Sequence, residues 1–227
     1  MIILSIDSTM GGCSAALHNS EEGAVANKVL EMSRGQAEHL MPMIDELLIE
    51  TRVGYNNIDK IAVTKGPGAF TGMRIGLAAA KSLSISLDIP IVGVCTFDSV
   101  LQTHMNDNRS SNYEYYGVLL ETKRRDYYFR MFDGDSLEPC SEKLCASSED
   151  VIELIGDRRC AILGDASQRF MSEIETDKDT IYYDIKLPCP YAVAQCSIHG
   201  GGGGCEPVYL RAPEIGVPKN PPRKMKS

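Results

Sequence analysis

A tight glycine turn followed by a helix of very small residues constrains the fold more than any other part of this sequence. The run GPGAFTGMRIGLAAAKSL spans Gly66 to Leu83. The segment before it, residues 58–64, alternates and is rich in β-branched residues, as is typical of a half-buried strand. We therefore expect a strand, a turn over residues 66–70 and a helix that Thr71 caps. This order of strand, turn and helix indicates a mixed α/β fold.

One stripe of the expected helix carries almost no side chain, because Gly72, Gly76 and Ala80 recur at every fourth position. A glycine inside a helix costs about 1 kcal/mol relative to alanine, so two on one face indicate that another backbone comes very close. That neighbour is either the chain's own sheet or a helix of a second protein. In the second case, Gly76→Leu should weaken the complex strongly and leave the folded monomer largely intact.

A second helix, expected over residues 36–52, has an unusually wide apolar stripe. Its apolar positions cover an arc of about 160° at 100° per residue, which is more than packing on one sheet requires. Pro42 should kink this helix or mark a late start. Together with the small-residue helix it would make a helix-bundle interface. The apolar positions are Leu40, Met41, Met43, Ile44, Leu47 and Leu48.

The order of expected elements divides the chain into two lobes. Residues 1–106 follow the order βββαβαβα, which is typical of an RNase-H-like or actin-like lobe. Residues 107–200 form a smaller α/β lobe with weaker periodicity. We expect residues 201–227 to contain a glycine hinge, a segment that returns to the first lobe and a disordered tail. The expected strands are 1–7, 12–17, 24–32, 58–64, 89–95, 115–121, 126–132 and 161–164, and the expected helices are 36–52, 71–87, 97–105 and 148–155.

Charge and cysteine content exclude several classes of protein. The net charge of −8 and the pI near 5.1 argue against a surface that binds a polyanion by itself. The basic clusters at 123–125 and 223–226 are short and are expected to be a solvated turn and tail. Eight cysteines without a CxxC pair, and no basic leader before the first strand, indicate reduced thiols in the cytosol. No apolar run approaches the roughly 20 residues needed to cross a bilayer.

Asp7, Ser8 and Thr9, at the end of the first strand, are candidates for binding a nucleotide. Their arrangement has the form of the first phosphate loop of actin-like ATPases, where a strand-end carboxylate orients Mg²⁺ and hairpin N–H groups hold phosphate. An aspartate that stabilises a hairpin through its own backbone fits equally well. An autonomous ATPase or kinase would use Asp7, Thr9 and the loop 200–204, and would lose Mg²⁺-dependent ATP turnover in Asp7→Asn.

Other catalytic sites find little support in the sequence. The four histidines, at positions 18, 39, 104 and 199, have neither HxxH nor HxxxH spacing, so we expect no metal site. A metallopeptidase, which would show chelator-sensitive proteolysis, is therefore the least supported alternative. The glycines at 66, 68 and 72 match a loose dinucleotide motif, but Pro67 removes an N–H and no acidic residue follows the next strand.

Five segments of the sequence resemble the TsaB proteins. They are ILSIDST, LMPMIDELL, GPGAFTGMRIGLAAAKSL, IPIVGVCTFDS and PVYLR. The strong motifs cover most of residues 1–100 and a short piece near the end, with Ala69 and Met73 where Ser and Leu are most usual. The resemblance implies an actin-like, Hsp70-like (ASKHA) fold of two lobes. It also implies a role in making threonylcarbamoyladenosine (t6A) on tRNAs that read codons beginning with A.

The same resemblance implies that catalysis belongs to a paralogous partner, TsaD. That partner holds a metal with a HxxxH pair just after a strand similar to IPIVGV, whereas Cys95 to Val100 contain no histidine. The chain would then be a noncatalytic cytoplasmic subunit that binds TsaD through its first two helices, supports the ATP-using TsaE and contacts tRNA only indirectly. No cofactor would be firmly bound, with ATP or ADP at the complex interface and self-pairing without TsaD as open alternatives. The predicted interface residues are Leu40, Met43, Ile44, Leu47, Phe70, Gly72, Arg74, Gly76 and Ala80.

Overall fold

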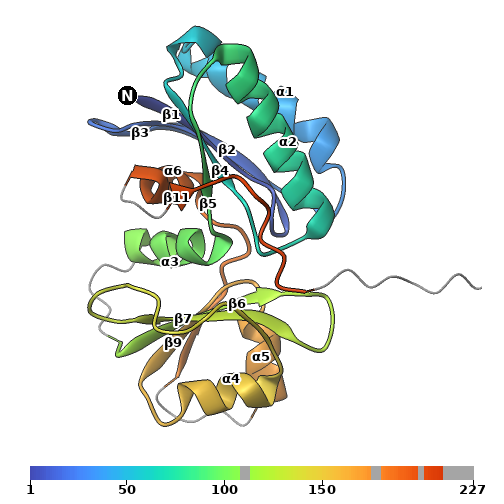
Figure 1. Ribbon diagram of the computed structural model, residues 1–227, viewed down its shortest axis with the longest axis vertical. Helices are drawn as coiled ribbons and strands as arrows, with labels where there is room; N and C mark the ends of the chain where they lie inside the picture. Colours follow the sequence, from blue (N-terminus) through green and yellow to red (C-terminus); the bar gives the residue numbers. More distant parts are fainter. Residues whose placement is uncertain (108–112, 175–179, 199–201, 212–227) are drawn as a thin grey trace, which may run out of the picture.

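The computed structural model describes residues 1–107, 113–174, 180–198 and 202–211, which form two α/β lobes (Figure 1). The sheet of the first lobe has the strand order β11-β5-β4-β1-β2-β3. Its centre is parallel, with Leu4 of β1 opposite Ile61 of β4, and its β2–β3 side is an antiparallel meander. The strands are β1 (Ile2–Asp7), β2 (Gly12–Asn19), β3 (Gly23–Glu31), β4 (Lys60–Thr64), β5 (Ile91–Val94) and β11 (Gly202–Gly203).

Helices cover both faces of this first sheet. On one face lie α1 (Gln36–Thr51) and α2 (Phe70–Leu87), and the short 3₁₀ helix η1 (Tyr55–Asn57) follows α1 (Figure 1). On the other face α6 (Pro190–Ile198) packs against the central strands, through a cluster that includes Ile3 of β1 and Val193. The first lobe is therefore a three-layer sandwich whose outer helix layer is α1 and α2.

The second lobe is built on a five-stranded sheet of order β10-β9-β6-β7-β8. Strands β10, β9 and β6 run parallel, whereas β6, β7 and β8 form an antiparallel meander. Helices α4 (Ser148–Ile155) and α5 (Ser167–Glu173) cover the face away from the first lobe (Figure 1). The strands are β6 (Tyr115–Glu121), β7 (Tyr127–Asp133), β8 (Leu144–Ala146), β9 (Cys160–Leu163) and β10 (Ile181–Tyr183).

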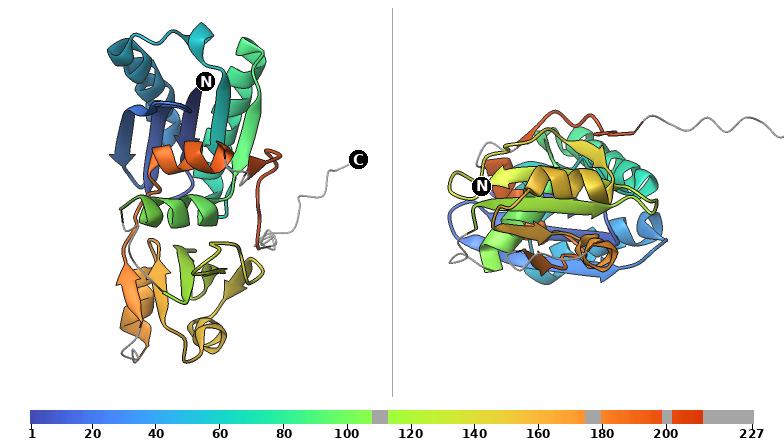
Figure 2. Two further views of the ribbon diagram at one scale, coloured as in Figure 1. Left: turned by 90° about the vertical axis from the view of Figure 1, so that its left-hand side faces the viewer. Right: turned by 90° about the horizontal axis from the view of Figure 1, so that it is seen from below.

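Helix α3 (Thr96–Asp107) joins the two lobes. It lies between α6 and the sheet of the second lobe (Figure 2). Phe97 and Val100 of α3 share one hydrophobic cluster with Tyr116 of β6 and with Met10, which follows β1. Phe97 and Val100 have no exposed surface, and Tyr116 is 1% exposed. The junction between the lobes is thus a packed core.

Several boundaries differ from the sequence-based expectation. Helix α2 begins at Phe70 with Ala69 as its N-cap, so Thr71 lies inside the helix and does not cap it. Helix α1 continues through Pro42 without a break. The expected second lobe, residues 107–200, wrongly included α6, because the buried side chains of this helix pack on the first sheet. In the predicted glycine hinge, Gly202–Gly203 pair with β5, and residues 199–201 lie outside the described part of the chain.

Candidate functional site

The glycine stripe of α2 packs against the turn that follows β1. A Cβ atom at Gly72 would overlap the carbonyl oxygen of Ser8, and one at Gly76 would overlap the Ser8 hydroxyl. That hydroxyl donates a hydrogen bond to the Gly72 carbonyl at 2.7 Å. The close neighbour is therefore the chain's own sheet. The expectation that Gly76→Leu would leave the folded monomer intact is wrong, because a leucine there would overlap the buried Ser8 side chain.

Asp7 ends β1 inside a network of threonine hydroxyls. Its Oδ1 accepts hydrogen bonds from the Oγ1 atoms of Thr9 and Thr64, both at 2.6 Å, and from the Thr9 backbone at 3.2 Å. Thr96 donates to the Thr9 hydroxyl at 3.2 Å. Because Thr64 ends β4 and Thr96 follows β5, this network ties together the ends of three parallel strands. Burial raises the pKa of Asp7, and the hydrogen bonds from Thr64 and Thr9 oppose that rise.

In this conformation Asp7, Ser8 and Thr9 do not fit a Mg²⁺–nucleotide. Asp7 and Thr9 have no exposed surface and Ser8 is 1% exposed. The next residue, Met10, belongs to the core between the lobes. Here Asp7 ties strand ends together through its Oδ1 atom and is closed to a nucleotide by burial.

Seven of the nine residues predicted to contact a partner are buried within the chain itself. Leu40 and Met43 are 1% and 7% exposed, and both belong to the cluster formed with β1, β2 and β4. These seven cannot form an accessible surface, because the wide apolar stripe of α1 packs on the sheet and the small-residue stripe lets the β1 turn approach. The buried residues are Leu40, Met43, Ile44, Leu47, Gly72, Gly76 and Ala80.

The opposite sides of α1 and α2 expose large apolar side chains. Ile85 is 82% exposed, Ile49 is 75% exposed and Phe70 is 51% exposed. The Arg74 guanidinium lies 3.8 Å from the centre of the Phe70 ring, and its Nε donates a hydrogen bond to the Tyr209 hydroxyl at 2.9 Å. We refer to Ile49, Phe70, Arg74, Ile85 and Tyr209 as the outer face. Phe70 and Arg74 were among the predicted contact residues, and the other three were not.

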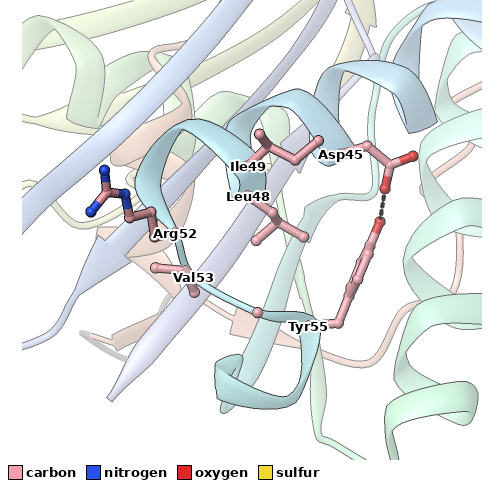
Figure 3. Close-up of a pocket in the computed structure, with 7 residues that line it drawn as sticks. Asp45, Leu48, Ile49, Arg52, Val53 and Tyr55 are labelled. Carbon is pink, nitrogen blue, oxygen red and sulfur yellow. Dashed lines mark hydrogen bonds between the residues drawn. The ribbon is translucent and has the colours of Figure 1, made fainter.

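A hollow of about 480 Å³ lies beside Ile49, where α1 ends (Figure 3). Its far wall is Tyr55 of η1, whose hydroxyl donates a 2.6 Å hydrogen bond to Asp45 of α1. Burial, followed by this bond to Asp45, raises the pKa of Tyr55 to about 12. Tyr55 and Asp45 thus form one wall of a hollow that adjoins Ile49 of the outer face.

Metal chemistry and membrane insertion find no support in the part of the chain that the structure describes. Within it, no group of three or more His, Cys, Asp or Glu side chains is placed to hold a metal ion. No described helix is both long and apolar enough to cross a bilayer. Two of the histidines, His18 and His104, are buried at 6% and 1% exposure.

Comparison with known proteins places the chain in a family. The family described as TsaD, tRNA N6-adenosine threonylcarbamoyltransferase, matches residues 16–177. A relative from Haemophilus influenzae, "tRNA threonylcarbamoyladenosine biosynthesis protein TsaB", is 26% identical over 200 residues, which are 83% of this chain and 81% of that protein. The chain belongs to the TsaB family. The predicted family resemblance is confirmed.

Another relative named as a TsaB protein matches less than half of the chain. The TsaB protein of Bacillus subtilis is 35% identical over 100 residues, which are 44% of this chain and 43% of that relative. In three dimensions, YeaZ from Pseudomonas aeruginosa has a TM-score of 0.77 at 22% identity, covering 92% of this chain and 99% of that structure. The predicted two-lobe, actin-like (ASKHA) fold is confirmed.

Sequence reasoning missed Ile49 and Ile85 because both lie outside the apolar stripes that it analysed. The positions three and four residues away from each isoleucine are exposed or half-buried, so both side chains lie on the solvent-facing side of their helix. Tyr209 could not have been assigned to the same surface from sequence, because it comes from the segment that returns from β11.

Proposed function

We propose that this TsaB-family chain is a noncatalytic, cytoplasmic subunit of the machinery that makes t6A on tRNA. In this proposal it binds a TsaD-type catalytic subunit through the outer face and supports a TsaE-type ATPase. The observation that carries the proposal is the exposure of Ile49 and Ile85 on two neighbouring helices. The pathway is taken from its relatives, which are named as tRNA threonylcarbamoyladenosine biosynthesis proteins.

The outer face has the chemistry of a helix-packing interface. Burying an isoleucine side chain stabilises a complex by about 1.5–3 kcal/mol, so two of them form a useful centre for an interface. Phe70 and Arg74 add an aromatic ring and a guanidinium group, the side chains most enriched where interfaces are strongest. A helix pair of the partner laid on α1 and α2 would cover these groups together. Without the partner, a second copy of this chain could cover them in the same way.

The test is reconstitution of t6A synthesis with TsaC-type, TsaD-type and TsaE-type proteins, with and without this chain. Mass spectrometry of the nucleosides measures the modified adenosine. We expect product only when the chain is present. Equal product in its absence would reject the accessory role.

A parallel assay separates this proposal from an autonomous ATPase. The full chain alone is incubated with Mg²⁺ and ATP, and phosphate release is measured for the wild type and for Asp7→Asn. We expect no turnover above the protein-free blank. Turnover that disappears in Asp7→Asn would favour a nucleotide enzyme instead.

A further inference from the structure

A groove of about 520 Å³ opens where the turn after β6 meets the last described residues of the chain. Three guanidinium groups line it, from Arg124, Arg125 and Arg211, together with Asp126 and Ser147. Arg124 and Arg125 are exposed on the turn between β6 and β7. We call this feature the arginine groove.

Two parts of the sequence that are far apart build the arginine groove. The segment after β11 runs from the first lobe to the second (Figure 1). At its end Arg211 forms a salt bridge with Asp126, and its Nη2 lies 3.4 Å from Sγ of Cys145 on β8. The other side is fixed by Thr122, whose hydroxyl accepts a hydrogen bond from the Arg124 backbone at 3.2 Å and donates one to the Asp126 carbonyl at 2.6 Å.

The charge of the groove is opposite to that of the whole chain. Three arginines and one aspartate leave a local excess of two positive charges, in a protein whose net charge is −8. A guanidinium group carries five N–H donors and no acceptor, in a fork that matches two oxygens of a phosphate. At Arg211 part of this fork already binds Asp126. The ligand should therefore carry several acceptor oxygens and at least two negative charges.

The lining favours a phosphate backbone over a single nucleotide. None of the five lining residues is aromatic, so the groove has no ring on which to stack a base. Contacts to phosphate fix the position of a nucleic acid without reading its sequence. A groove lined by arginines and without an aromatic ring is suited to such phosphate contacts.

We propose that the arginine groove binds the phosphodiester backbone of RNA. Naming that RNA as tRNA rests on the proposed function. The groove would give the chain a direct contact with the substrate, in addition to the indirect contact that the family resemblance implies.

The test measures binding of the full chain to a fluorescein-labelled, unmodified tRNA transcript by fluorescence anisotropy. The KCl concentration is varied between about 50 and 200 mM. For the wild type, affinity should fall as salt rises. For the double variant Arg124→Glu/Arg125→Glu, we expect about tenfold weaker binding and a salt dependence that is shallower by about 1.5 in log–log slope.

The matched control is Arg158→Glu/Lys186→Glu. Arg158 and Lys186 are exposed and do not line the groove, and their replacement changes the net charge by the same amount. This control should bind RNA within about twofold of the wild type, because only local charge is lost in the groove variant. Equal losses in the two double variants would overturn the proposal, as would a wild type that does not bind RNA. Thermal unfolding of each variant verifies that it is folded.

Competition separates the possible sources of phosphate. Unlabelled tRNA should displace the probe, whereas ATP and inorganic phosphate at the same concentration should not. Displacement by equimolar ATP would overturn the RNA assignment in favour of a nucleotide. The assay needs neither partner subunit, so its failure leaves the accessory role standing, and failure of the reconstitution leaves the groove standing.

Discussion

The helix layers that cover the two sheets differ in their helix caps, their ion pairs and the apolar side chains that they expose. In the second lobe, the Ser147 hydroxyl caps α4 by accepting a hydrogen bond from the Asp150 backbone, and Arg169 of α5 bridges Glu121 and Glu173. In the first lobe, neither α1 nor α2 has a side-chain cap. The outer sides differ as well. The most exposed apolar residues are 82% and 75% exposed on α2 and α1, against 45% for Ile152 of α4 and 40% for Met171 of α5.

The α4–α5 layer has its caps and ion pairs within the chain and exposes less apolar surface, so we call it the complete layer. The α1–α2 layer is packed on its inner side only. Helices α1 and α2 pack on the sheet through their inner stripes, whereas Ile49 and Ile85 on the outer side are 75% and 82% exposed. An apolar surface of that kind is typical of a contact with another protein.

The largest expected effect tests the inner side of this layer. Gly72→Val should lower the free energy of unfolding by about 3 kcal/mol, because its Cβ would overlap the Ser8 carbonyl oxygen and neither backbone can move away. Urea unfolding followed by circular dichroism measures the change. The control Ala78→Val, at an exposed position of the same helix, should cost only about 0.5 kcal/mol. Equal costs would mean that the stripe is not tightly packed.

The next effect tests the outer side. Ile85→Asp should weaken binding to a TsaD-type partner by about 2 kcal/mol, or roughly 30-fold, while unfolding changes much less. Calorimetric titration of the partner gives the affinity. Ile152→Asp on α4 introduces the same charge in the complete layer and should leave the affinity unchanged. If both variants bind normally, the outer face is not the contact surface.

A third effect concerns Asp165, which lies between β9 and α5. Burial raises the pKa of Asp165 to about 7, although its carboxylate accepts a hydrogen bond from the Glu121 backbone at 2.9 Å. The folded state therefore holds a proton that the unfolded state has lost, and stability falls as pH rises from about 4 to about 7. Asp165→Asn should remove this fall.

At pH 8 the Asp165→Asn variant should be more stable than the wild type by about 1.5 kcal/mol, a figure reduced because the side chain is partly exposed. At pH 4 the two proteins should be equally stable. Urea unfolding across this range makes the comparison. A difference that does not vary with pH would rule out titration of this carboxyl as its source.

The smallest effect tests the cap itself. Ser147→Ala removes the side-chain acceptor at the start of α4 and should cost about 1 kcal/mol of stability. Urea unfolding measures it. The same variant should leave partner binding unaffected, since the complete layer takes no part in the proposed contact. A cost near zero would remove one of the contrasts between the two layers.

Much of the first lobe could be predicted from sequence because its signals are local. Alternation gave β1, β2 and β4, and the 3.6-residue period gave α1 and α2, within a few residues of their observed ends. The second lobe was less predictable. Strand β10, with three residues, and helix α5, with seven, are too short for a reliable period. The placement of α6 depends on a return of the chain from the second lobe that no local pattern encodes.

The site was harder to predict than the fold. The small-residue stripe of α2 was identified as a close-packing surface, but the sequence could not say whether Gly76 faces a partner or Ser8. Two glycines on one face fit both cases equally well. The wide stripe of α1 was predicted to belong to a partner interface, whereas it packs on the sheet. Arg124 and Arg125 of the arginine groove could be recognised in the sequence as part of a basic cluster. Arg211 joins them only because the segment after β11 brings it there. Contacts between distant segments supplied what local patterns lacked.

Helix α3 also determines how the two lobes unfold. Because Phe97 and Val100 of α3 are buried in the cluster that joins the two lobes, separating the lobes would expose both side chains to water. The lobes should therefore melt together in one cooperative transition, and the slowest-exchanging amides of both should report the same opening free energy. Either half of the chain, expressed alone, would expose its side of this apolar cluster to water.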